Sequence, residues 1–227
     1  MKATSRSTPQ RGLTLVELLI GLALGLLLTA AATTLLAAQW REQRSLTIEN
    51  RLMQDLRTAS DVIVRDLRRA GHWGAAASGI RVAGSDASAS NPYAALTPDA
   101  AASDVARFRY SRDAAENHTV DANEEFGMRL RNGAIELLLG AGNWQSLTDA
   151  GTLTVTGFAI TPTIQEIDLA EHCALPCPAG STSCPRQQVR SLAVVVTARS
   201  AADASVTRSL RSEVRVRNDA VLGACPV

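Results

Sequence analysis

Aromatic residues are scarce in this chain of 227 residues, of which they make up 4%. Pockets for small ligands are lined mainly by apolar and aromatic side chains, so the scarcity disfavours an aromatic-lined pocket and, with it, an enzyme. An excess of either charge is also lacking, because 23 basic and 22 acidic residues give a formal charge of +1. Proteins that bind nucleic acids usually carry a basic patch. We therefore expect no direct nucleic-acid partner, and favour a protein or a membrane as the partner.

Cysteine is absent from the first three quarters of the chain and then occurs four times, at Cys173, Cys177, Cys184 and Cys225. An even number is typical of disulfides formed in an oxidising compartment, and all three possible pairings stay open. A zinc site usually needs two Cys-x-x-Cys pairs, whereas three, six and forty residues separate these cysteines. Residues 121–125 lack the glycine and terminal glutamate of an EF-hand calcium loop, so we expect an acidic turn there. No metal, cofactor or catalytic residue is expected.

Charged residues are almost absent from residues 13–38, where Glu17 is the only one. A helix needs about 20 apolar residues to cross a bilayer. Residues 1–12 contain three basic residues and no acidic one, and such a flank stays in the cytoplasm. We therefore expect a single-pass inner-membrane helix followed by a periplasmic domain. The alternative is a secretory signal peptide cut within residues 29–38, although the apolar run is about twice the length of a usual signal core.

The carboxylate of Glu17 is the most informative feature of this apolar segment. A charge at such a place costs on the order of 3 kcal/mol, and it normally meets a partner there. If the chain is cut after Gly12, the new amine of Leu13 is such a partner, about one helical turn from Glu17. The pair can form within one helix, or between neighbouring helices, where it would fix the axial register of one subunit against the next.

Residues 11–20, with the sequence RGLTLVELLI, resemble the N-terminal signal of type IV prepilins and pseudopilins. The resemblance implies cleavage between Gly12 and Leu13 by a membrane prepilin peptidase, N-methylation of Leu13 and a role of Glu17 in subunit register. One difference is that the family most often has Phe where this chain has Leu13.

Residues 40–70 show the periodicity of an amphipathic helix. Their apolar residues recur every three or four positions and are Ile48, Leu52, Leu56, Ala59, Ile63, Leu67 and Ala70. Charged residues occupy the other positions. We therefore predict that the apolar and amphipathic segments form one continuous helix, which ends at Gly71 and Gly74.

Residues 65–74, with the sequence RDLRRAGHWG, resemble the region after the helix in minor pilins of the PilW family. This resemblance implies a structural subunit that helps to initiate a type IV pilus and sits near its tip, supporting twitching motility and adhesion. Its partners would be other minor pilins, the major pilin and a tip adhesin. His72 and Trp73 are expected to seat the helix on a sheet.

The remaining sequence favours β-strands. Residues 75–106 are rich in small and polar residues and predict a long surface loop. Residues 128–139 predict a hairpin, because the dipeptide Asn132-Gly133 suits a tight turn. Further strands are predicted at residues 152–155, 158–161, 189–198 and 210–216. The sequence thus predicts an α+β, pilin-like fold in which the periplasmic half of the long helix packs on an antiparallel sheet.

Four segments follow from these predictions. They are a leader peptide (1–12), a transmembrane and filament-core helix (13–38), an amphipathic periplasmic helix with its end (39–74), and a globular head with a disulfide-bearing C-terminal region (75–227). Two other functions remain open at this point. One is a minor pseudopilin of a type II secretion system, and the other is a membrane-tethered periplasmic binding or enzymatic domain.

Overall fold

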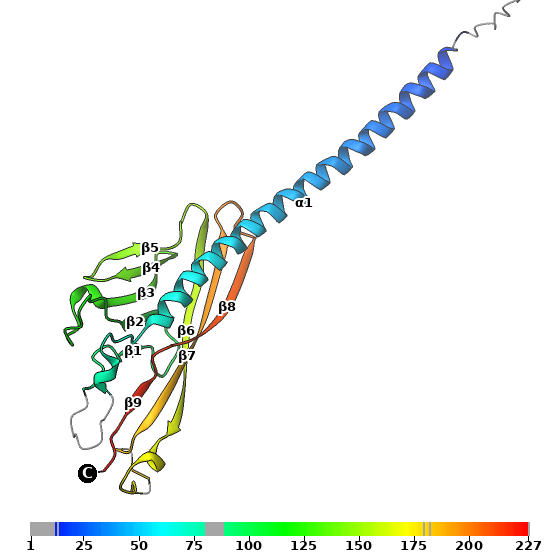
Figure 1. Cartoon of the computed structure of the whole chain (residues 1–227). Coiled ribbons are helices and arrows are strands. Elements are labelled where there is room, and N and C mark those ends of the chain that lie inside the picture. Colours follow the sequence, from blue (N-terminus) through cyan, green and yellow to red (C-terminus); the bar gives the residue numbers. More distant parts are fainter. Residues whose placement is uncertain (1–11, 13, 80–88, 179, 182, 227) are drawn as a thin grey trace, which may run out of the picture. The chain divides into compact units, whose positions relative to one another are not determined.

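The structure is a computed structural model that describes residues 12, 14–79, 89–178, 180–181 and 183–226 (Figure 1). The chain divides into two compact units, residues 1–47 and residues 48–227. Helix α1 (Leu15–Arg69) begins in the first unit and ends in the second. Leu13, the expected first residue of the processed chain, lies outside the described residues.

The first unit contains the apolar part of α1. Its large apolar side chains, from Leu15 to Leu46, are exposed. By length and composition, α1 can cross a membrane. Apolar side chains that no other part of their unit covers need another apolar environment, either lipid or neighbouring helices. This part of the helix is therefore built to function outside water.

The second unit contains the rest of α1 and all the strands. The strands are β1 (Leu96–Thr97), β2 (Val105–Arg109), β3 (Glu125–Arg131), β4 (Ala134–Leu139), β5 (Trp144–Ser146), β6 (Leu153–Asp168), β7 (Arg186–Ser200), β8 (Thr207–Arg215) and β9 (Ala220–Leu222). Short 3₁₀ helices lie at Ala76–Gly79, Ala122–Glu124 and Ala170–His172. One sheet has the order β1-β2-β3-β4-β5, and the other has the order β6-β7-β8, with β9 also paired to β7. All pairings are antiparallel.

The predicted hairpin is confirmed as β3 and β4. Asn132 and Gly133 connect the strands with φ angles of 50° and 75°, which is the left-handed conformation that a two-residue hairpin turn requires. A side chain at Gly133 would also meet the Thr154 side chain at 2.8 Å. Local turn chemistry therefore determines the register of this hairpin.

The predicted apolar stripe of α1 is also confirmed. Leu52, Leu56, Ala59, Ile63 and Leu67 are buried. The leucines and the isoleucine share one core with Met128 and Ile135 of the first sheet and Ile160, Val194 and Val214 of the second. Fully burying such a side chain stabilises a fold by about 1.5–3 kcal/mol. The helix is therefore the element on which both sheets pack.

Two polar contacts fix α1 against β8. The Arg208 Nε donates to Glu49 Oε1 over 2.9 Å, and the hydroxyls of Ser60 and Ser212 lie 2.7 Å apart. Both contacts lie beside the buried apolar residues of α1. They therefore fix the position of the helix along β8.

The structure corrects three details of the predicted fold. The helix packs on two sheets, whereas the sequence suggested one. The predicted loop at residues 75–106 contains β1 and the start of β2, because its short runs find strand partners only in the tertiary structure. The strands predicted at 152–155 and 158–161 are parts of one strand, β6, since the register shift between Val155 and Gly157 interrupts the periodicity without ending the strand.

Candidate assembly surfaces

The start of α1 carries the residues expected to act in processing and register. The Glu17 N–H donates to Thr14 Oγ1 over 3.3 Å, which makes Thr14 an N-terminal cap of the helix. Glu17 thus lies in the first turn of α1, where the helix dipole favours a negative charge. Gly12 is exposed. Among the described residues, the Glu17 carboxylate has no ion-pair partner.

The end of α1 is held by hydrogen bonds from distant parts of the second unit. Gly71 has a φ of +74°, which suits glycine at a helix C-terminus, and its N–H donates to the Arg109 carbonyl over 2.8 Å. The Asn218 side chain donates to the Ala70 carbonyl over 3.0 Å, and the Asn91 side chain donates to the Gly71 carbonyl over 2.9 Å. These bonds satisfy groups that a helix end leaves free. The junction therefore fixes where the helix ends relative to both sheets.

Arg190 of β7 lies beneath this junction and is 8% exposed. Its Nη1 donates to the Ala94 carbonyl over 2.7 Å, and its Nη2 donates to the Asn218 carbonyl over 2.9 Å. Burial lowers the pKa of Arg190, and the charge of Asp219 opposes that shift. The guanidinium remains charged at neutral pH and ties the segment before β1 to the segment after β8.

Trp73 is buried and His72 is exposed, and neither side chain is shown in contact with a sheet. The Trp73 ring is buried and meets the His118 ring edge to face, with centroids 5.6 Å apart. The His72 side chain is exposed, and only its backbone takes part, because its carbonyl accepts the Ser111 N–H over 2.9 Å. The tryptophan therefore packs on the segment between β2 and β3, and its seating of the helix on a sheet stays a prediction.

A buried polar cluster near Trp73 was not predicted from the sequence. The hydroxyl of the fully buried Tyr93 lies 3.0 Å from Glu116 Oε1, 3.1 Å from Glu124 Oε2 and 3.1 Å from the Thr119 carbonyl. Burial, with the hydrogen bond to Glu116, raises the pKa of Tyr93. The spacing of these residues in the sequence follows no pattern that would predict the cluster. The only local signal is the acidic turn predicted at residues 121–125, which the structure shows as a capping box around Ala122–Glu124.

Glu116 joins this cluster to the end of α1. Burial alone would raise its pKa, but hydrogen bonds from the Ser111 side chain, the amides of His118 and Gly74 and the Tyr93 hydroxyl hold it below its ordinary value. All of these contacts are hydrogen bonds between groups of the second unit, and they hold the Glu116 side chain in place. Within the described residues, no group of three or more His, Cys, Asp or Glu residues could hold a metal ion.

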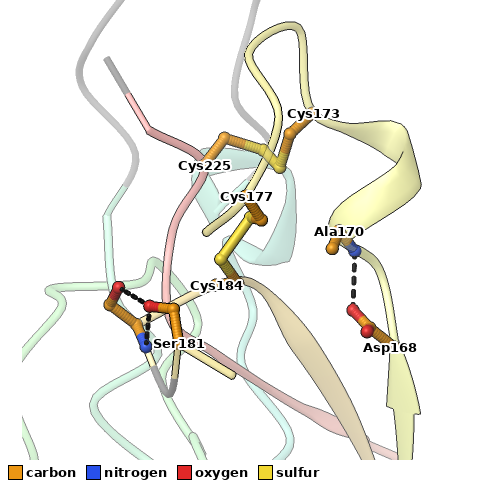
Figure 2. The surroundings of a disulfide bond; sticks show 8 residues. Asp168, Ala170, Cys173, Cys177, Ser181, Cys184 and Cys225 are labelled. Atoms are coloured by element: carbon orange, nitrogen blue, oxygen red, sulfur yellow. Dashed lines mark hydrogen bonds between the residues drawn. A yellow bond between two sulfur atoms is a disulfide. The ribbon is translucent and has the colours of Figure 1, made fainter. Parts of the chain in front are cut away.

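Two disulfides hold the C-terminal region (Figure 2). Cys173 pairs with Cys225, and Cys177 pairs with Cys184, with Cα–Cα distances of 5.3 Å and 6.1 Å. This is one of the three pairings that the sequence left open. The Asp168 carboxylate accepts the N–H of Ala170, the first residue of the short helix before Cys173, over 2.8 Å. The segment after β6 is therefore joined covalently to the segment after β9.

Comparisons with known families give two matches. A family model described as "Prepilin peptidase-dependent protein B" matches residues 45–216, and one described as "Prokaryotic N-terminal methylation motif" matches residues 7–33. No curated protein and no solved structure matches the chain. The first match covers most of the second unit. The second covers the three residues to which processing and register were assigned, Gly12, Leu13 and Glu17.

Proposed function

The chain belongs to the family of prepilin peptidase-dependent protein B, and we propose that it is a minor pilin that helps to initiate a type IV pilus and sits near its tip. The two family matches support the broader class, a type IV pilin or pseudopilin. The narrower role comes from the resemblance of residues 65–74 to PilW minor pilins. The protein performs no catalysis in this proposal, and acts by associating with other subunits.

Processing precedes assembly in this proposal. Prepilin peptidase cuts between Gly12 and Leu13, and Leu13 is N-methylated. The match of residues 7–33 to the methylation motif supports both steps. After the cut, the apolar part of α1 leaves the bilayer for a bundle of like helices, where its exposed side chains find apolar neighbours.

Glu17 sets the register of each subunit in that bundle. Its carboxylate has no partner among the described residues, and an unpaired charge in apolar surroundings is costly. The N-terminal amine of a neighbouring subunit removes this cost only at one axial position. A subunit that arrives out of register leaves both charges unpaired.

Localisation and partners follow from this mechanism. A single-pass inner-membrane anchor is supported by the apolar helix and by the methylation motif. We propose that the N-terminus faces the cytoplasm and the head faces the periplasm, where its disulfides form. The partners are prepilin peptidase, other minor pilins, the major pilin and a tip adhesin, and the outcome is twitching motility and adhesion.

The observation that carries the proposal is Glu17, the single carboxylate within the apolar part of α1 that matches the methylation motif. The matched test compares Glu17→Gln with Glu42→Gln, which neutralises an exposed carboxylate beyond the apolar segment. We expect both variants to reach the membrane, and Glu17→Gln alone to be lost from sheared surface fibres. Equal recovery of both variants in the fibres would contradict the role of Glu17.

A minor pseudopilin of a type II secretion system is the second candidate, because the family description specifies dependence on prepilin peptidase and no kind of fibre. Deletion of the gene distinguishes the two. Loss of surface pili with intact secretion supports the pilin, whereas exoproteins trapped in the periplasm of normally piliated cells support the pseudopilin.

A further inference from the structure

Three arginines line one hollow at the end of α1. Arg68 belongs to the last turn of the helix, Arg215 is the last residue of β8, and Arg217 follows two residues later. Together with Val216 they line a hollow of about 390 Å³, called here the arginine hollow. Like charges that share one wall repel each other, and a hollow lined by one sign of charge attracts the opposite sign. The arginine hollow therefore favours an anion.

The charges of the arginine hollow are only partly compensated. The Arg215 Nη2 lies 3.0 Å from Asp219 Oδ2, so these two residues form an ion pair. Neither Arg68 nor Arg217 forms an ion pair within the described part of the chain. The three guanidiniums and the one carboxylate thus leave two positive charges without a counter-charge.

The helix dipole explains only one of these arginines. A cation in the last turn of a helix is stabilised there, which accounts for Arg68. The Arg217 N–H donates to the Arg68 carbonyl over 3.2 Å, and this bond brings a second charge beside the first. Burial raises the pKa of Asp66 on α1, and the charges that oppose this shift are those of Arg65 and Arg69. The Asp66 carboxyl therefore interacts with arginines outside the arginine hollow.

The backbone of β8 adds a hydrogen-bond donor on the same side. The Val216 N–H donates to the Arg190 carbonyl of β7 over 2.9 Å, and the backbone groups of successive residues in an antiparallel ladder point to alternate sides. The Arg215 N–H therefore points away from β7, to the side on which the Arg217 N–H meets α1. It makes no hydrogen bond within the residues that the structure describes. Backbone N–H groups and guanidiniums are the donors that bind oxyanions in proteins.

The balance of charge favours a phosphate over a carboxylate. A guanidinium can bind either group through two parallel hydrogen bonds. One carboxylate neutralises a single positive charge, whereas a phosphate monoester carries about −1.5 to −2 at pH 7, which matches the two charges without a counter-charge. A nucleic acid needs a basic patch or stripe that follows its backbone, and the formal charge of the whole chain is only +1. The arginine hollow thus fits a single phosphate group.

We propose that the arginine hollow binds one phosphate group, either as free phosphate or as part of a phosphorylated head group. The guanidiniums of Arg68 and Arg217 supply the uncompensated charge, and Arg215 supplies its backbone N–H. A bound phosphate would join the end of α1 to the segment after β8. This inference goes beyond the proposed function and does not depend on it, because every residue involved belongs to the second unit.

Calorimetric titration of the full-length protein, in a non-ionic detergent and a phosphate-free buffer, tests the proposal. The probes are inorganic phosphate, acetate and glycerophosphoglycerol, which is the water-soluble head group of phosphatidylglycerol. We expect inorganic phosphate to bind, and acetate to bind at least about tenfold more weakly. Tighter binding of glycerophosphoglycerol than of inorganic phosphate would assign the site to a lipid head group, and the reverse order would assign it to free phosphate.

The matched variants are Arg217→Gln and Arg199→Gln. Arg199 is an exposed arginine of β7 that pairs with Thr207, at the other end of the β7–β8 ladder from Arg215. We expect Arg217→Gln to weaken phosphate binding by at least about tenfold, and Arg199→Gln to change it by less than about twofold. Arg68→Gln is a second variant with the same expected loss as Arg217→Gln. Intact disulfides in all variants show that the head has folded.

Three results would overturn the phosphate site. The first is that the unmodified chain binds neither inorganic phosphate nor glycerophosphoglycerol. The second is that acetate binds as tightly as phosphate, which would indicate a site for a carboxylate, such as an acidic side chain of another protein. The third is an equal loss of binding in Arg217→Gln and Arg199→Gln, which would indicate a general effect of positive charge rather than a site in the arginine hollow.

Discussion

The two parts of α1 have the same secondary structure and opposite solvation. Before residue 48, large apolar side chains are exposed on all sides of the helix, whereas beyond it the apolar residues form one stripe that is buried under two sheets. An all-apolar helix needs lipid or other helices around it, and an amphipathic helix needs a core. One continuous helix is thus built for two environments, and substitutions in its two parts should have different consequences.

The largest expected effect separates Leu56 from Leu27. Leu56 is fully buried and Leu27 is 66% exposed. We expect Leu56→Ala to lower the free energy of unfolding of the head by about 2–5 kcal/mol, because it leaves a cavity in the core. Leu27→Ala should leave it unchanged. Denaturation of the full-length protein in mild detergent, followed by tryptophan fluorescence, measures both, and equal effects would break the contrast between the two parts.

The disulfides provide a second contrast between the two units, because both of them lie in the second unit. Replacing Cys173 and Cys225 by serine should cost about 2–4 kcal/mol of head stability, since this link closes the longer loop, of 52 residues in sequence separation. The control replaces Cys177 and Cys184, whose separation is seven, and should cost less. A larger loss in the control would contradict the argument from loop length.

Glycines on either side of the unit boundary provide a third contrast. Gly71 has a positive φ and would place a Cβ 3.2 Å from Arg190 Nη2, whereas Gly25 has nothing within 4 Å. We expect Gly71→Ala to destabilise the head by about 1–2 kcal/mol, because a left-handed conformation is costly for alanine. The same unfolding measurement should show no loss for Gly25→Ala, and a loss there would show that the first unit contributes to head stability.

The smallest expected effect concerns pH. The folded-state pKa of Glu116 is held below its ordinary value of 4.5, mainly by hydrogen bonds that outweigh burial. Its contribution to stability is therefore complete above pH 4.5 and is lost as the pH falls through the lowered folded-state pKa. Glu116→Gln should make head stability less dependent on pH in this acidic range. An unchanged profile between pH 3 and pH 5, on the order of the carboxyl range, would contradict the hydrogen-bonded role of Glu116.

Sequence patterns were sufficient where structure is local. The spacing of Leu52, Leu56 and Ile63 predicts the buried stripe, and Asn132-Gly133 predicts the hairpin, because 3.6-residue periodicity and positive φ angles are properties of short segments. Sequence patterns predict two strands where the structure has one, β6, because the register shift between Val155 and Gly157 looks like a strand end in sequence.

Long-range contacts could not be predicted in this way. Tyr93, Glu116 and Glu124 meet only after the chain folds, and nothing in their spacing indicates a cluster. Nothing in the sequence around Arg190 indicates that its side chain is buried. The bridge between Ser103 and Ile160 of β6 also joins residues far apart in the sequence, and only the tertiary structure determines it.

The central claim is that this chain is processed as a prepilin, and the mass of the N-terminal peptide tests it most directly. The protein is extracted from membranes with and without active prepilin peptidase. We expect a chain that starts at methylated Leu13 and is lost without the enzyme. A start near residue 39, or an uncut Met1 in both samples, would contradict the claim and favour a secreted or tethered domain.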